Sequence, residues 1–107
     1  MSIKYQNYEK KYKKIDREFL DIEDSFIDLA NKHCNSGDYE KISIAFLHAA
    51  ARFNAFEVWA SAADIAEFKS EKNTEQKYFE AIYKKRLNEE LNEFETNFDK
   101  YRKELAI

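Results

Sequence analysis

The chain of 107 residues has the length of one domain and contains a single Gly and no Pro, which argues against a sheet protein with many tight turns and favours an all-α fold. Hydrophobic residues make up 44% and charged residues 36% of the sequence, a composition typical of a soluble globular protein. The longest uncharged run, residues 42–51, is about half of the ~20 apolar residues that a membrane span requires, so we expect no membrane segment.

The first predicted element is a helix over residues 5–33, in which apolar side chains recur in steps of three and four. The polar residues 35–37 end with the only Gly, which favours closure of a helix there, and Asp38 then caps the next helix. We divide the chain into a basic, Tyr- and Lys-rich extension, residues 1–17, continuous with the first helix, and a helical domain, residues 18–107.

The central helix is expected to continue to about Ser70, because residues 42–68 contain no Gly or Pro and are rich in Ala and Phe. One apolar series at helical spacing is typical of a core face: Ile42, Phe46, Ala49, Phe53, Phe56, Ala60 and Ala63. A second series points away from the first: Ile44, Leu47, Ala51, Ala55, Val58, Ala62 and Ile65. A helix that is apolar on most sides must be covered on most sides.

A third helix is predicted to start at a capping box in residues 73–76 and to run to the chain end with a coiled-coil-like seam over residues 83–105. Three long helices joined by short turns predict an antiparallel up-down-up bundle. Three slender helices leave apolar surface uncovered, so we expect a homodimer, a protein partner, or both.

Arg52 lies among small and aromatic residues that would bury its stem. One interpretation is a structural ion pair with Asp24 or Asp28 of the first helix, because an unpaired buried guanidinium is costly. The alternative is that Arg52 and Asn54 reach outward to a ligand or partner.

Catalytic and metal sites have little support in the sequence. Asp21, Asp24 and Asp28 share one side of a helix and, with Glu23, form either a hard-cation site of a small metal-dependent enzyme or a solvated acidic face, which is favoured. No Gly-rich phosphate loop exists, and the adjacent pair His33 and Cys34 point in different directions on a helix. We expect no enzyme activity, no metal and no cofactor.

The basic extension suggests a different class of function. Lysines interleaved with tyrosines are able to contact phosphates and stack on bases, and the lysines concerned are Lys10, Lys11, Lys13 and Lys14. A nucleic-acid-binding helical module is therefore the alternative to a solvated helix end whose tyrosines lie on the seam.

Three strings resemble an uncharacterised bacterial family, the domain of unknown function 3144: SFIDLANKH at 25–33, AFLHAAARFNAF at 45–56 and NFDKYRKEL at 97–105. The resemblance covers about residues 18–104 and implies a small helical protein with no agreed activity and no catalytic residues. Within the family, the chain also resembles a small Legionella protein that inhibits effector enzymes. This resemblance implies a partner of deamidase or transglutaminase type that acts on ubiquitin.

The same resemblance implies a bacterial cytoplasmic location with translocation into a host cell, and the Glu-rich tail with Leu105 suits a Dot/Icm secretion signal. A lone Cys fits a reducing compartment.

The favoured hypothesis is a non-enzymatic regulator that binds itself and blocks a partner enzyme by covering its active-site region or substrate surface. Aromatic and Arg side chains dominate interface energetics. The predicted partner-binding residues are Arg52, Phe56, Trp59 and Phe68 as anchors, with Glu57 and Asp64 for electrostatic steering.

Overall fold

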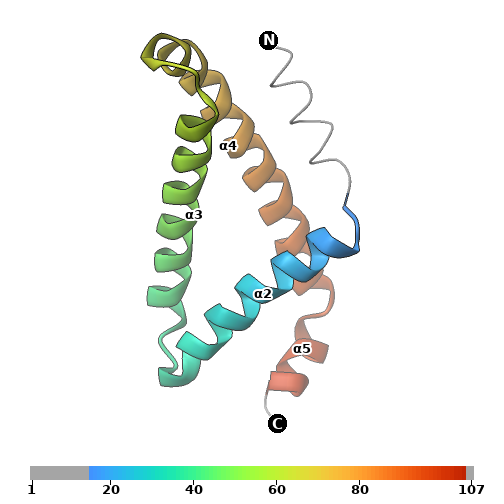
Figure 1. Ribbon diagram of the computed structural model, residues 1–107. Coiled ribbons are helices and arrows are strands. Elements are labelled where there is room, and N and C mark those ends of the chain that lie inside the picture. The colour runs from blue at the N-terminus through green and yellow to red at the C-terminus, as the bar shows by residue number, and fades with distance from the viewer. Residues whose placement is uncertain (1–14, 106–107) are drawn as a thin grey trace. The chain divides into compact units, whose positions relative to one another are not determined.

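The computed structural model describes residues 15–105, and every regular element in that part of the chain is helical (Figure 1). The elements are α2 (Arg17–His33), the short 3-10 helix η1 (Cys34–Ser36), α3 (Tyr39–Ser61), α4 (Ile65–Thr96) and α5 (Phe98–Leu105). The prediction of an all-α fold is confirmed for these residues. The chain divides within α3 into two units, Met1–Ala50 and Ala51–Ile107, which we describe one at a time.

The first unit begins with a capped helix. Asp16 has an extended backbone, and its Oδ1 accepts a hydrogen bond of 2.9 Å from the backbone N–H of Phe19. The sequence predicts one unbroken helix from Tyr5, but Ile15 and Asp16 are not helical, so α2 begins at Arg17. The proposed basic extension falls almost wholly on residues 1–14, which lie outside the described part, and it stays a prediction.

The end of α2 follows the prediction from sequence. Gly37 has a φ of 82°, in the left-handed region that favours glycine, and its N–H donates to the carbonyl of Cys34 at 2.9 Å. The Oδ1 of Asp38 accepts a hydrogen bond of 3.1 Å from the N–H of Lys41, which caps α3. The predicted stop at residues 35–37 and the predicted cap are both confirmed.

The boundary between the second and third long helices differs from the prediction. The central helix ends at Ser61 instead of Ser70, and α4 begins at Ile65. Asp64 is the N-cap of α4, accepting from the N–H of Glu67 at 2.8 Å, while Glu67 Oε2 accepts from the N–H of Ala63 at 3.0 Å. The first bond satisfies one of the donors that a helix start leaves free, and the second satisfies the N–H of the residue just before the cap. The capping box predicted in residues 73–76 is wrong, because those residues lie inside α4.

Replacing Asp64 by Ala should lower the free energy of unfolding by about 1 kcal/mol, the usual cost of losing an N-cap. Urea unfolding followed by circular dichroism measures the change, and Asp64→Asn should retain most of the stability. Asn73→Ala is the matched control, because Asn73 lies in the middle of α4 and should lose nothing. A larger loss for Asn73→Ala than for Asp64→Ala would contradict this boundary.

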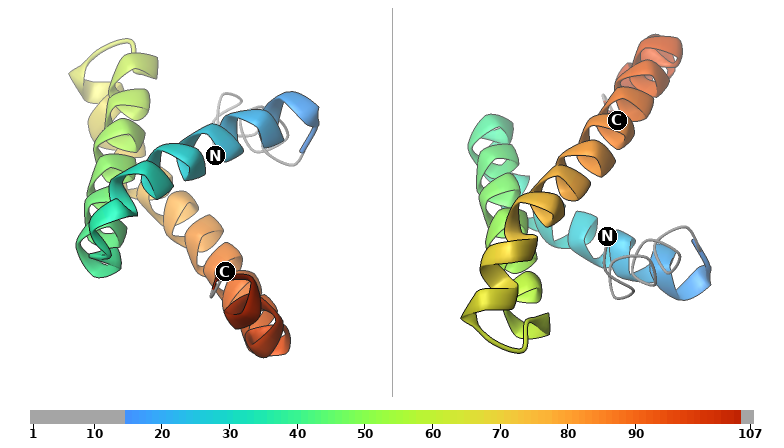
Figure 2. Two further views of the ribbon diagram at one scale, coloured as in Figure 1. Left: turned by 90° about the horizontal axis from the view of Figure 1, so that it is seen from below. Right: turned by 90° about the horizontal axis from the view of Figure 1, so that it is seen from above.

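The predicted continuous third helix is interrupted once near its end. Figure 2 shows α4 as a continuous helix after the turn that follows α3, and Figure 1 shows the break that precedes α5. The break is at Asn97, whose side-chain amide donates to the backbone carbonyl of Glu93 at 3.1 Å and to its Oε1 at 3.0 Å. Backbone bonds from Asn97 to Glu93 and from Tyr101 to Asn97, of 3.0 and 2.9 Å, span the break. A polar side chain that bonds its own helix is a common cause of such an irregularity.

Few side chains are buried in the described part of the chain. Val58 is 7% exposed and Glu75 is 5% exposed, and no other residue there is classed as buried. Large apolar side chains are exposed on all four α-helices, including the series predicted to be a core face, of which Phe46, Phe53 and Phe56 are exposed. Within the described residues, no helix is both long enough and apolar enough to cross a membrane.

Candidate functional site

Three aromatic side chains form a ridge on the C-terminal half of α3, inside the second unit. Phe53, Phe56 and Trp59 are 67%, 54% and 65% exposed. Ring centroids are 5.7 Å apart between Phe53 and Phe56, and 6.0 Å apart between Phe56 and Trp59. Both distances lie within the range in which aromatic pairs attract one another. We call these three residues the aromatic ridge.

The contacts within the aromatic ridge matter for binding, because each ring limits the rotamers of the next. Ordering a free side chain at an interface costs roughly 0.5–1.5 kcal/mol. Rings that already rest on one another lose less of this freedom when a partner covers them. The ridge is therefore an apolar surface partly prepared for contact.

Arg52 is exposed next to the aromatic ridge. It makes no ion pair with the described residues of its own unit, 51–105. The structural ion pair predicted with Asp24 or Asp28 would join residues of the two units and stays a prediction, as does the outward contact. Arginine and aromatic residues are both enriched at protein interfaces.

The other predicted contact residues are held by local bonds or partly covered. Glu57 is half-buried, and its Oε1 accepts a hydrogen bond of 3.2 Å from the hydroxyl of Ser61. Asp64 caps α4, and Phe68 is half-buried. The steering role proposed for the two acids stays a prediction, while the structure gives Asp64 a definite task in starting a helix.

Two exposed apolar residues were missed by the sequence analysis of this site. Phe53 was assigned to a core face, and Ile65, at the start of α4, was assigned to the second apolar series of the central helix. Both are 67% exposed. The available signal was the excess of apolar positions around the central helix, which indicates that some remain uncovered but does not identify them.

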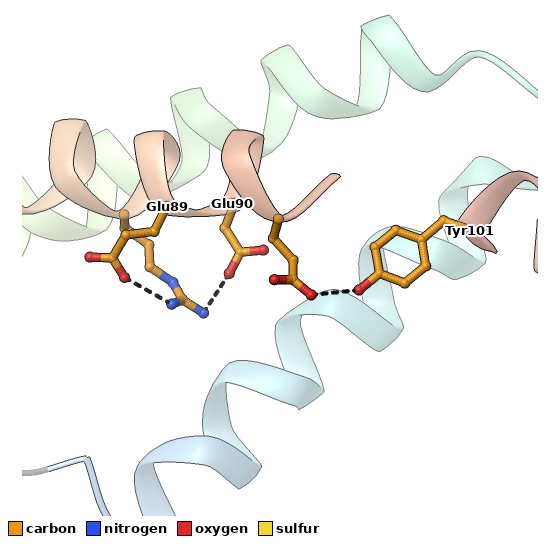
Figure 3. A network of polar contacts seen from close by, with 5 residues as sticks. Glu89, Glu90 and Tyr101 are labelled. Carbon is orange, nitrogen blue, oxygen red and sulfur yellow. Dashed lines mark hydrogen bonds and ion pairs between the residues drawn. The ribbon is translucent and has the colours of Figure 1, made fainter. Parts of the chain in front are cut away.

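A second feature lies where α4 meets α5. An open groove is lined there by three apolar or aromatic side chains and three acids: Phe94, Tyr101, Leu105, Glu90, Glu93 and Glu104. The phenol of Tyr101 donates to a carboxylate, Glu93 Oε1, at 2.8 Å (Figure 3). The ring of Tyr101 also lies 5.1 Å from the ring of Phe94, edge to face. These contacts attach α5 to the end of α4.

The acids in this region are partly compensated by one arginine. Arg86 pairs with both Glu89 and Glu90, the two acids labelled in Figure 3, at N···O distances of 3.7 and 2.7 Å. Exposed pairs three and four residues apart on a helix contribute roughly 0.3–0.5 kcal/mol each. They therefore stabilise α4 slightly and do not form a charged binding pocket.

The hydrogen bond to Glu93 raises the pKa of Tyr101, and nearby acids raise it further. The folded pKa exceeds the unfolded one, so the bond's contribution is complete below the unfolded value and is lost as pH rises through the folded value. We expect the phenol of Tyr101 to ionise at higher pH than free tyrosine. The pKa is measured by titrating the absorbance at 295 nm of the wild type and of Tyr101→Phe and subtracting the second curve from the first. In Glu93→Gln the same difference should move to lower pH, and an unchanged titration would contradict the assignment.

The alternatives to protein binding gain no support from the described residues. No group of three or more His, Cys, Asp or Glu side chains in the described part is placed to hold a metal ion, and Asp21 pairs with Arg17 at 3.4 Å. The lysines of the nucleic-acid alternative, residues 10–14, lie outside the described residues. That alternative stays an untested prediction.

Comparison with known proteins identifies a family that covers most of the chain. The family model described as protein of unknown function (DUF3144) matches residues 19–94, from the first turn of α2 to the last turns of α4. The match includes the aromatic ridge and omits α5. Neither the curated proteins nor the solved structures contain a significant match.

Proposed function

This chain belongs to the DUF3144 family of proteins of unknown function, and we propose that it is a non-enzymatic regulator that binds a partner enzyme and inhibits it. The observation that carries the proposal is the exposed aromatic ridge on α3. Contiguous exposed apolar surface on a small protein is typical of a protein-binding site.

The composition of the surface favours a protein as the ligand. Trp, Phe and Arg are enriched where binding energy concentrates, and Arg52, Phe56 and Trp59 occupy neighbouring positions on the last turns of α3. A small-molecule site is normally concave. The ridge instead consists of exposed rings along one helix, which suits insertion into a groove of a partner or coverage of its substrate surface.

The class of partner rests on the resemblance to the Legionella inhibitor. We propose an effector enzyme of deamidase or transglutaminase type that acts on ubiquitin, met in the bacterial cytoplasm or after translocation into a host cell. The Glu-rich C-terminal segment is proposed as the secretion signal.

Self-association is a separate part of the proposal. Exposed apolar side chains on every described α-helix support a homodimer, and an antiparallel up-down-up bundle is the arrangement of helices that we propose within it. Sedimentation equilibrium of the full chain measures the mass directly.

Inhibition is testable with purified components. A ubiquitin-deamidating effector of the same bacterium is incubated with ubiquitin, with and without this protein, and the products are separated on a native gel. Deamidation converts Gln to Glu and adds one negative charge to ubiquitin, which shifts the band. We expect a stoichiometric complex and loss of the shifted band. Full deamidation in the presence of excess protein, with no complex on size exclusion, would contradict the proposal.

A further inference from the structure

An apolar stripe follows one side of α4 into α5. Its members recur in steps of four and three residues, the spacing of a two-helix seam: Leu87, Leu91, Phe94, Phe98, Tyr101 and Leu105. All are exposed except Tyr101, which is half-exposed. The ring contact between Phe94 and Tyr101 keeps the stripe continuous across the break at Asn97. We call this set the C-terminal stripe.

The two edges of the C-terminal stripe differ in charge. Glu95 follows Phe94 and Arg102 follows Tyr101, so both lie on the same edge, one heptad apart. Both are exposed, and neither makes an ion pair in the described part of the chain, although the Arg102 guanidinium lies 4.7 Å from the centre of the Phe98 ring. The opposite edge carries Glu90, Asn97 and Glu104 and no base.

This distribution of charge discriminates between the two orientations of a pair of identical stripes. In a parallel pair, opposite edges face each other, which places Glu90 of one copy against Glu95 of the other. In an antiparallel pair, like edges face each other, so Glu95 faces Arg102 of the second copy, and two-fold symmetry forms that ion pair twice. Asn97 then faces Glu104, an amide able to donate to a carboxylate.

The same charges also select the register. When Phe94 packs on Leu105 of the second copy, Phe98 packs on Tyr101, and the ion pairs form as described. A shift by one heptad in either direction brings Glu95 against Glu95, or Arg102 against Arg102. A shift by two heptads toward the N-terminus of α4 places Lys84 within the apolar seam. Only the first arrangement satisfies both the apolar and the charged positions.

We propose that two copies of this chain pair antiparallel along the C-terminal stripe, with Glu95 of each copy beside Arg102 of the other. The inference rests on the self-association proposed above and adds the surface, the orientation and the register. It also assigns the dimer contact to residues separate from the aromatic ridge, which leaves the ridge free for the partner enzyme.

Charge exchange tests the pairing. The full chain is prepared as wild type, Arg102→Glu, Glu95→Arg and the double variant, and the dimer dissociation constant is measured by sedimentation equilibrium at low salt. Each single change should weaken the dimer roughly tenfold, since two symmetric ion pairs turn from attraction into repulsion. The double variant should restore the wild-type constant. Lys103→Glu, exposed beside Arg102 but off the stripe, is the matched control and should change it little. Circular dichroism verifies that every variant keeps its helix content.

Each contrary result has a distinct meaning. A monomeric wild type would overturn the proposed self-association and this inference with it, while leaving enzyme inhibition to its own assay. A dimer that the single changes do not weaken would overturn the stripe alone, as would failure of the double variant to restore it. A dimer strengthened by Glu95→Arg would indicate parallel pairing and overturn the proposed orientation.

Discussion

Replacing Trp59 by Ala is expected to weaken binding of the partner enzyme by about 30-fold, equivalent to roughly 2 kcal/mol. Trp59 is 65% exposed, so a partner has most of the indole left to cover. Covering about 130 Å² of indole surface contributes about 3 kcal/mol to the binding free energy at ~25 cal/mol per Å². The cost of association offsets part of this contribution. Isothermal titration of the purified effector enzyme with each variant measures the change.

The matched control for Trp59 is another exposed aromatic on the same helix. Tyr39→Ala, at the first position of α3, removes a ring of similar exposure away from the aromatic ridge and should leave the affinity unchanged. Phe53→Ala should weaken binding by a smaller amount than Trp59→Ala, because the two side chains are about equally exposed and the phenyl ring offers less apolar surface than the indole. Equal affinity of Trp59→Ala and wild type would show that the partner binds elsewhere.

Replacing Val58 by Asp is expected to destabilise the fold by about 2–4 kcal/mol, the largest loss of stability that we predict for any single change. Val58 is 7% exposed and is the one buried apolar residue in the described part of the chain. A carboxylate at this position would lose its hydration without gaining a partner, because no basic side chain is buried there. Urea unfolding followed by circular dichroism gives the difference in free energy.

Ala55→Asp is the control for Val58→Asp. Ala55 lies on the same helix and is exposed, so its replacement should cost only the difference in helix propensity, about 0.7 kcal/mol. If both variants lose the same amount, burial at Val58 does not contribute to stability. Such a result would place the stabilising contacts elsewhere in the protein.

Local chemistry accounts for the parts of the fold that the sequence predicts well. Gly37 closes η1, the 3-10 turn that follows α2, because a left-handed φ is accessible to it, and Asp38 caps α3 through a bond to a residue three positions on. In both cases the residues that determine the helix boundary lie within a few positions of one another in the sequence. The break before α4 is equally local but depends on Asp64 and Glu67 acting together in a stretch with strong helix formers. Because residues 42–68 contain no Gly or Pro, the sequence predicts a helix that continues through Asp64 and Glu67 to about Ser70.

Burial is harder to predict than helix position. A periodic apolar series shows that a face needs covering, but the series is the same whether the cover comes from the same chain or from another. Phe46, Phe53 and Phe56 have the spacing of a core face and are nevertheless exposed. For the candidate site, Arg52, Phe56 and Trp59 were predicted from their residue types and are exposed, and their role in binding stays a prediction. Phe53, predicted to lie on a core face, is exposed, and Asp64 is a helix cap.

The aromatic ridge contains the only Trp of the protein. Its intrinsic fluorescence therefore comes from one indole that is largely in water, and its emission will shift to shorter wavelength when another protein covers the ring. The molecule thus carries a label-free optical reporter at the surface proposed for enzyme binding. Pairing through the C-terminal stripe, which Trp59 does not belong to, leaves that signal unchanged, so emission and mass together distinguish the two associations.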